Sequence, residues 1–252
     1  MIARITIAES RTEFLKLFRL PRYTIPTILF PLAFYAFFGL AFGASRGFAG
    51  TTVGTYLLAT FGAFGVVGCA LFAFGVSVAV ERGQGWLLVK RASPMPPLAY
   101  LSAKIVTSVA FAACVVILLC ALGAACGGVR LSVTTWLALF GALVLGALPF
   151  CALGLAIGSL AGPNSAPAIV NLVYLPMSFA SGLWVPFDQL PAGVRAVAPW
   201  LPTYHLGQLA LGAIGAGRGT IVEHVLGLLV WTFAGVGLAA YGMRRDEGRT
   251  YG

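Results

Sequence analysis

Long apolar stretches alternate along this chain with short charged segments. Three uncharged runs stand out in the first half, from Thr24 to Gly43, from Gly54 to Val80 and from Ile105 to Cys126. Each run reaches the length of roughly 20 residues that a helix needs to cross the hydrocarbon core of a bilayer. The pattern therefore predicts three membrane-spanning helices in this part of the chain.

The second half of the chain holds a longer uncharged run, residues 131–187, which is too long for one span. A break is predicted at residues 161–167, AGPNSAP, because glycine and proline cannot continue a helix at low cost. The run then divides into a fourth span at 133–160 and a fifth at 167–185. A sixth span is predicted from about Val222 to Met243.

Residues 1–22 mix charged and apolar side chains, and they are predicted to form an amphipathic helix that lies in the membrane interface. On a helical wheel, the apolar arc holds Ile7, Phe14, Leu15, Leu17 and Phe18, and the opposite arc holds Glu9, Thr12, Glu13, Lys16 and Arg19. Pro21 and Pro26 favour a break before the first span. The alternative is that these residues form the polar first turns of a long membrane helix.

The composition agrees with a membrane protein. Of the 252 residues, 60% are hydrophobic and only 9% are charged, whereas a soluble domain has about 25% charged residues. The predicted fold class is therefore an all-α membrane protein, with one transmembrane domain over residues 1–252. The net charge of +9 suits loops beside anionic lipid, and no nucleic-acid partner is expected.

The positive charges favour one side of the predicted bundle. Twelve lysines and arginines lie on the side that carries both termini and the loop between the second and third spans, and four lie on the other side. The positive-inside rule places the richer side in the cytoplasm, so we expect a multi-pass protein of the inner (plasma) membrane with both termini cytoplasmic. The four outer arginines are Arg46, Arg130, Arg195 and Arg218.

Residues 186–220 lie on the outer side in this topology but remain rather apolar. Two helical pieces, near 191–198 and 203–214, are too short to cross the bilayer. They are predicted to be interfacial or re-entrant helices that cap the outer side. The alternative, a disordered loop, is disfavoured by the low charge and by apolar residues such as Trp200 and Tyr204.

Several kinds of chemistry have no support in the sequence. Without a Gly-Lys dipeptide the chain has no GxxxxGK[ST] phosphate-binding loop, so it is not expected to bind ATP in that way. Aspartate and glutamate are missing from the middle of every predicted span, which disfavours an ion-coupled transporter. The five cysteines form no CxxC pair and are interpreted as small packing residues. No catalytic residue, metal or cofactor is expected in this chain.

A compact basic segment, residues 81–104, separates the second and third predicted spans. Its apolar turn of Trp86, Leu87 and Leu88 stops against a proline cluster that begins at Pro94. A membrane subunit that is driven by a separate cytoplasmic motor needs a short, stiff docking element joined directly to its spans. The segment fits that need, and the alternative is an ordinary positively charged loop.

Residues 80–106 resemble the first cytoplasmic loop of the type-2 permeases of ATP-binding-cassette (ABC) exporters. In that family a Glu-Arg pair, a glycine turn, an apolar patch and a proline precede a lysine that opens the third helix. The matching residues are Glu81, Arg82, Gly85, Leu87, Leu88, Pro94 and Lys104. Residues 84–86, QGW, depart from the usual Gly-Thr-Leu turn and its acidic successor. Residues 158–205 are similar to the family's fifth span and outer helices.

The resemblance implies a permease subunit that pairs with a second permease subunit, identical or different, and docks two ABC ATPase subunits, which would hold ATP and Mg²⁺. Its cargo would be amphiphilic or hydrophobic, such as a drug, antibiotic, lipid or glycolipid, exported from the cytoplasm or inner leaflet. The residues that the resemblance assigns to ATPase coupling are Glu81, Arg82, Gly85, Trp86, Leu87, Leu88 and Pro94. The rival hypothesis is a membrane channel or assembly scaffold that uses no ATP.

Two helical faces are candidates for lining a substrate pathway. They consist of Phe61, Phe64 and Phe72 on the second span and of Asn171, Tyr174, Ser178 and Ser181 on the fifth. One interpretation is a cavity with aromatic walls and a polar seam, suited to an amphiphile. The other is helix packing, in which glycines allow close approach and polar side chains bond across helices.

Overall fold

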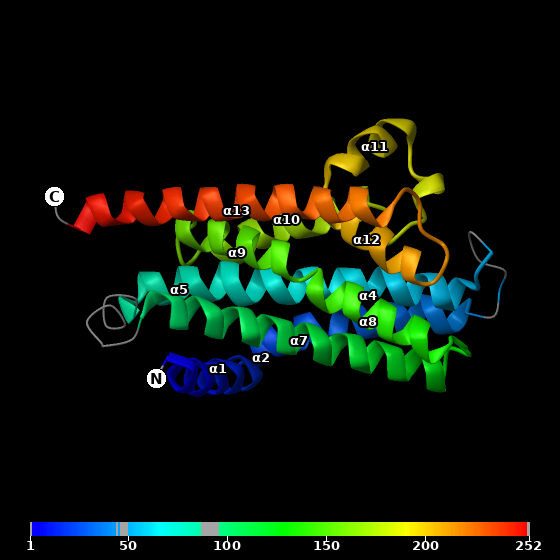
Figure 1. The fold of residues 1–252 in the computed structure, drawn as a ribbon, viewed down its shortest axis with the longest axis horizontal. Helices are drawn as coiled ribbons and strands as arrows, with labels where there is room; N and C mark the ends of the chain where they lie inside the picture. Colours follow the sequence, from blue (N-terminus) through cyan, green and yellow to red (C-terminus); the bar gives the residue numbers. More distant parts are fainter. Residues whose placement is uncertain (1, 44, 46–49, 87–95, 251–252) are drawn as a thin grey trace.

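The computed structural model describes residues 2–43, 45, 50–86 and 96–250, and these residues contain helices and no strands. The long helices lie side by side (Figure 1). Four helical stretches are long and apolar enough to cross a membrane, namely Val53–Gly83, Leu98–Ala125, Val133–Leu160 and Ile221–Arg245. Two shorter apolar helices, Ile25–Leu40 and Ala166–Ala180, correspond to the first and fifth predicted spans.

The first helix, α1 (Ile2–Phe18), is seen almost end-on in Figure 1, so it crosses the long helices. It packs against α7 (Pro97–Ala125). Leu17 of the predicted apolar arc is buried there, but so is Glu13 of the polar arc. The helical wheel misplaced Glu13 because its carboxylate pairs with the ammonium of Lys104 on α7, which the wheel cannot include.

The first apolar helix is irregular, with wide π-type turns between short α-helical pieces. It consists of α2 (Pro21–Thr24), η1 (Ile25–Leu29), α3 (Phe30–Phe34) and η2 (Tyr35–Leu40). Pro26 lies in the first π turn and Pro31 follows it. Proline donates no backbone hydrogen bond and its ring displaces the preceding turn, so local widening is a physical consequence of these residues.

A continuous helix runs through the middle of the bundle and consists of α4 (Val53–Leu71), η3 (Phe72–Val76) and α5 (Ser77–Gly83). Its close packing depends on glycines of α9 (Leu148–Leu160). A Cβ on Gly154 would lie 2.8 Å from Phe74 Cβ, and one on Gly158 would lie 2.9 Å from the Gly75 carbonyl oxygen. This GxxxG pair therefore packs helices within one chain.

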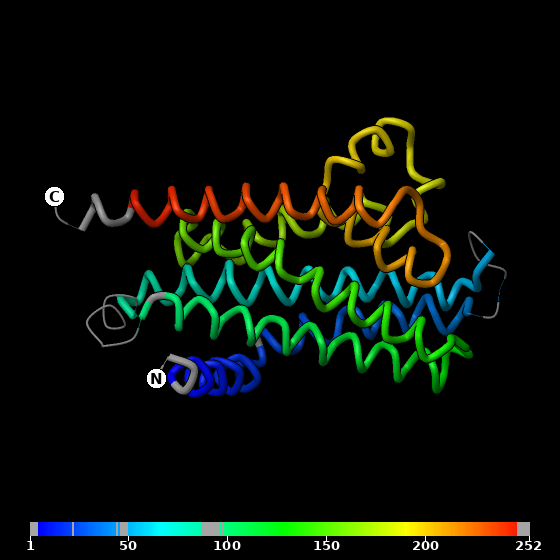
Figure 2. The backbone as a smooth tube through the Cα atoms, viewed as in Figure 1, coloured from blue at the N-terminus to red at the C-terminus, as the bar shows by residue number. Residues whose placement is uncertain are grey.

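The predicted fourth span is bent. Figure 2 shows α8 (Val133–Leu145) running into α9, from which the chain returns through α10 (Ala166–Ala180). Pro149 lacks the N–H that would bond the Leu145 carbonyl, so the helix is interrupted there. The break predicted at residues 161–167 is observed, because α9 ends at Leu160 and α10 begins at Ala166.

The region between α10 and the last helix folds into short helices. These are η4 (Phe187–Gln189), α11 (Ala192–Val197), η5 (Ala198–Trp200) and α12 (Pro202–Ala213), and α13 (Ile221–Thr250) follows them. The two predicted pieces correspond to α11 and α12. On α12, His205 Nδ1 lies 3.1 Å from Nδ1 of His224 on α13. Burial, followed by the neighbouring His224, lowers the pKa of His205.

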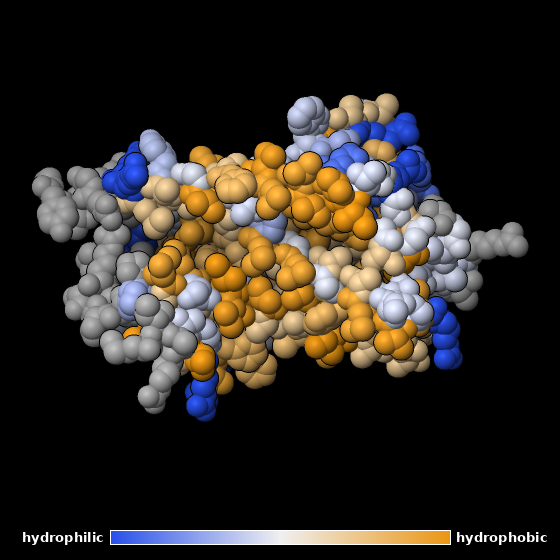
Figure 3. Space-filling model, viewed as in Figure 1, coloured by the Kyte–Doolittle hydropathy of each residue, from blue (hydrophilic) through white to orange (hydrophobic). Residues whose placement is uncertain are grey.

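The two ends of the bundle differ in what they carry. The start of α1, the end of α13 and the end of α5 lie at one end, whereas α11 and α12 lie toward the other (Figure 1). Figure 3 shows apolar residues as a broad band across the middle of the visible face, with hydrophilic residues toward both ends. Such a surface fits a bilayer, whose hydrocarbon core cannot hydrogen-bond to polar groups.

Candidate coupling site and substrate pathway

Four charged side chains from three helices form an ion cluster where α5 leads into residues 81–104. Lys104 Nζ of α7 lies 2.9 Å from Glu81 Oε1 and 2.9 Å from Glu13 Oε2 of α1. It also donates to Ser77 Oγ at 2.7 Å, so all three ammonium protons have acceptors. Lys16 of α1 pairs with the same Glu81 oxygen. We call these five residues the ion cluster.

The ion cluster is buried, and this makes its charge balance important. Lys104 is only 2% exposed and Glu81 only 3%. Two carboxylates face two ammonium groups, and the Tyr100 hydroxyl donates to Glu81 Oε2 at 2.6 Å. A buried charge that loses its partner is costly, because water no longer compensates it. The cluster therefore holds α1, α5 and α7 together.

Arg82 binds a different helix from those that its neighbour Glu81 contacts. Its guanidinium donates to the backbone carbonyls of Ser159 and Ala161, the latter at 2.5 Å. These carbonyls lie at the end of α9, where no further helical turn supplies donors and the helix dipole is negative. The Glu81–Arg82 pair thus connects the start of residues 81–104 to α1 and α7 on one side and to α9 on the other.

The remaining coupling candidates lie in the turn that follows. Gly85 ends the helix with φ +75°, a left-handed conformation that other residues adopt at a cost. A Cβ there would meet no atom within 4 Å, so the backbone conformation and not crowding favours glycine. Trp86 is exposed. Leu87, Leu88 and Pro94 lie outside the described residues.

Most of the predicted pathway residues meet in an aromatic cluster in the middle of the bundle. Phe61 and Phe64 of α4 are buried. Tyr174 of α10 stacks on Phe64 with ring centroids 4.7 Å apart, and its hydroxyl donates to the Phe64 carbonyl at 2.8 Å. Phe72 meets the same tyrosine edge-on at 6.3 Å. The predicted faces of the second and fifth spans therefore contact each other within one chain.

Glycine creates the space for this contact. A Cβ on Gly68 would lie 2.8 Å from the Tyr174 hydroxyl, so any larger residue would displace the tyrosine. Ser178 lies one turn after Tyr174 on α10 and is fully buried. Its hydroxyl makes no hydrogen bond to any described residue. Ser181 pairs with the hydroxyl of Thr203 on α12. Asn171 is exposed, and its side-chain nitrogen donates to a carbonyl one turn earlier at 3.1 Å.

Two large aromatic residues of this cluster were not found from the sequence. Trp184 lies 5.4 Å from Phe64 and 5.5 Å from Phe34 between ring centroids. It lies near the end of the predicted fifth span, four residues after α10 ends at Ala180, and its indole N–H has no partner among the described residues. The ion-cluster residues Glu13, Lys16 and Ser77 were also missed as site residues. Their signal is Lys104, a lone lysine early in an apolar helix, because such a buried charge needs a partner of opposite charge.

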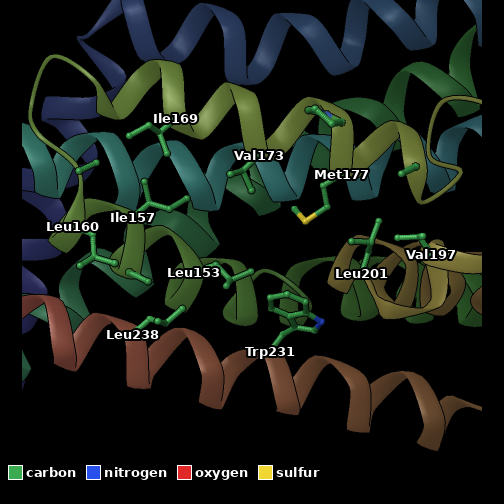
Figure 4. Close-up of a pocket in the computed structure, with 14 residues that line it drawn as sticks. Leu153, Ile157, Leu160, Ile169, Val173, Met177, Val197, Leu201, Trp231 and Leu238 are labelled. Atoms are coloured by element: carbon green, nitrogen blue, oxygen red, sulfur yellow. The ribbon is translucent and has the colours of Figure 1, made fainter. Parts of the chain in front are cut away.

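An apolar cavity of about 630 Å³ lies beside α10 but is not lined by the aromatic cluster. Figure 4 shows its walls, with Val173 and Met177 on α10, Ile157 on α9 and Trp231 on α13. None of the predicted pathway residues borders it. Over the described part of the chain there is also no group of three or more His, Cys, Asp or Glu residues that could hold a metal ion.

These features define a multi-pass membrane permease, and comparison with known proteins gives its family. Residues 6–214 match the family model described as ABC-2 type transporter, so the chain belongs to that family as its non-catalytic transmembrane permease subunit. The chain is also 28% identical over 239 residues to the "Putative transport permease YvfS" of Bacillus subtilis (strain 168), covering 95% of this chain and 97% of that protein. The family resemblance found in the sequence is confirmed.

We predict that Lys104→Met will destabilise the protein by about 3–5 kcal/mol, because Glu13 and Glu81 then remain buried without their shared ammonium. Thermal unfolding of the detergent-purified chain measures this. Lys16→Met is the matched control, because the Lys16 side chain is 43% exposed and its loss should cost less.

Adding Glu13→Gln to Lys104→Met should restore part of the lost stability, because it removes the carboxylate that is in excess and leaves Glu81 paired with Lys16. Equal losses for Lys104→Met and Lys16→Met, with no recovery in the double variant, would contradict the proposed charge balance of the ion cluster.

Proposed function

We propose that this permease is the membrane subunit of an ABC exporter that moves an amphiphilic or hydrophobic substrate out of the cytoplasm or inner leaflet. The observation that carries the proposal is the Glu81–Arg82 pair, which links the start of the coupling segment to α1, α7 and α9. A channel or scaffold without ATP would have no use for a docking segment anchored to several helices.

The proposed architecture has six membrane spans, made of the four long apolar stretches and the two shorter apolar helices. In it α1 lies in the interface, and α11 and α12 form the outer cap. Both termini and residues 81–104 face the cytoplasm. The support is the distribution of lysine and arginine. In addition, the start of α1, the end of α13 and the end of α5 lie at the same end of the bundle (Figure 1).

In the proposed mechanism, two ABC ATPase subunits bind ATP and Mg²⁺ and dock on residues 81–104 of a permease dimer. Membership of the family implies ATPase partners. A displacement of the docked segment acts on Glu81 and Arg82, whose partners lie on other helices, so several helices move together. Buried ion pairs suit this role, because separating their charges is costly and they therefore resist slippage.

The proposed pathway runs along α4 and α10. Tyr174 and Ser178 of α10 are buried, and Tyr174 packs on Phe64 of α4, whereas Asn171 is exposed. This arrangement is a closed state, in which aromatic rings occupy the space that cargo would use. Parting α10 from α4 would expose the tyrosine hydroxyl, its carbonyl partner and the unpaired Ser178 hydroxyl to an amphiphile.

The first test concerns orientation. In a background without the five native cysteines, Lys90→Cys should react with a membrane-impermeant maleimide only after the cells are permeabilised, whereas Arg195→Cys should react in intact cells. The positive-inside rule places position 90 in the cytoplasm. Labelling of position 90 in intact cells would refute the orientation.

The second test concerns coupling. The double variant Leu87→Asp/Leu88→Asp places charge in an apolar contact, so ATPase co-purification and ATP-driven transport should both fall at least about tenfold while membrane insertion persists. Thr51→Asp/Thr52→Asp, in the connection before α4, is the control. If the first variant retains normal binding and transport, residues 81–104 are only a charged loop.

The third test concerns the pathway. Asn171→Cys, Tyr174→Cys and Ser178→Cys should react with a small water-soluble thiol reagent when the permease is assembled with its ATPase, and nucleotide should alter the rates at 174 and 178. A wet cavity supplies the water that these reagents need.

The neighbouring positions 172, 173 and 179 are the matched controls, because their side chains are exposed apolar groups on the same helix. In this proposal 172 and 179 face lipid, and 173 borders the separate apolar cavity beside α10. Absence of reaction at positions 171, 174 and 178, with the complex intact, would leave helix packing as the role of this face.

A further inference from the structure

A second cavity, of about 720 Å³, lies where α8, α12 and α13 meet, at the end of the bundle that carries the outer cap. Its lining consists of an apolar part and a group of polar residues that we call the mouth. The apolar part includes Leu145, Leu228 and Leu229, and the mouth includes Gln208, Arg218 and His224. Its volume lies in the range of about 300–1,000 Å³ that is typical of ligand sites. None of its lining residues belongs to the aromatic cluster.

Gln208 provides a buried hydrogen-bond donor at the mouth of this cavity. The residue is only 4% exposed, and its Oε1 accepts the backbone N–H of Arg218 at 2.8 Å. Its Nε2 bonds to no other described residue. Because Gln208 lines the cavity, this amide N–H group is available to an acceptor oxygen that enters the cavity.

The other groups at the mouth restrict the chemistry of the ligand. Both ring nitrogens of His224 are occupied, one by His205 at 3.1 Å and the other by the Arg218 carbonyl at 2.5 Å. The Arg218 guanidinium is half exposed and pairs with Asp188, which leaves further N–H groups of its fork for another acceptor. Asp188 balances the charge of Arg218, and Glu223 lies beside Gly219 of the lining, so the mouth offers N–H donors and no net positive charge. Arginine and amide N–H groups suit the oxygens of a phosphate group.

The apolar part of the cavity requires an alkyl chain. Its walls belong to the stretches Val133–Leu160 and Ile221–Arg245, both of which are long and apolar enough to span the bilayer. Gly141 of α8 and Gly212 of α12 line the cavity and face open space, because a Cβ at either position would meet no atom within 4 Å. A phosphate alone would leave the apolar walls uncovered.

We propose that this cavity is a binding site for one phospholipid of the adjacent leaflet, with an acyl chain between α8 and α13 and the phosphate at Gln208 and Arg218. The lipid is a resident ligand and not the cargo, since it shares no residue with the proposed pathway. The proposal does not depend on the direction of transport or on the identity of the substrate. Loss of the bound phospholipid would loosen the contact between α12 of the outer cap and α13.

Native mass spectrometry of the detergent-purified full chain, titrated with palmitoyl-oleoyl-phosphatidylglycerol, tests the proposal. Gly141→Leu fills the cavity from α8, and Gln208→Glu keeps the acceptor for the Arg218 N–H while replacing the donor with a negative charge. Each should lower the affinity of the tightest lipid by about tenfold or more. Gly237→Leu is the matched control, because a Cβ there also meets no atom within 4 Å and the position lies outside the cavity.

Equal lipid retention by Gly141→Leu and Gly237→Leu, with both variants folded by thermal unfolding, would overturn the proposal. So would displacement of the lipid by excess inorganic phosphate, because the site would then recognise the anion alone. If Gln208→Glu does not fold, the comparison of the two glycine variants still decides the question.

Discussion

The buried ammonium of Lys104 is the interaction on which the arrangement of this end of the permease depends. In an apolar protein such a charge is tolerable only if carboxylates accompany it. Here one carboxylate comes from α5 and the other from α1, and neither can leave without stranding the remaining charges. The position of α1 across the bundle is therefore set by ion pairing as well as by apolar contact.

The long elements of this fold could be predicted because the signal for a membrane span is summed over many residues. An uncharged run of sufficient length identifies a span whatever its neighbours are, and the prolines and glycines of residues 161–167 identify the break. The bend before Pro149 and the π turns near Pro26 were not predicted. Their causes are visible in the sequence, but the extent of each distortion depends on packing against other helices.

Site residues could be predicted only where the residues of a motif lie close together in the sequence. Glu81 and Arg82 stand together in a short motif, and the family resemblance drew attention to them. The partner of Lys104 on α1 is 91 positions away, and a helical wheel sorts Glu13 by its polarity and not by that contact. The same reasoning explains why Trp184 was missed, since its aromatic neighbours belong to two other helices.

One continuous helix, Val53–Gly83, carries Glu81 and Arg82 of the proposed coupling site and the phenylalanines of the proposed pathway. Glu81 lies at its end and Phe64 lies more than four turns earlier. Between them is the π turn Phe72–Val76, where the backbone hydrogen bonds are wider than in an α-helix and where Gly75 packs closely on α9. π turns inside α-helices are frequent at functional sites. In the proposed mechanism, a displacement of Glu81 reaches Tyr174 along this helix, and the close packing of Gly75 on α9 and α10 carries the displacement to those helices as well.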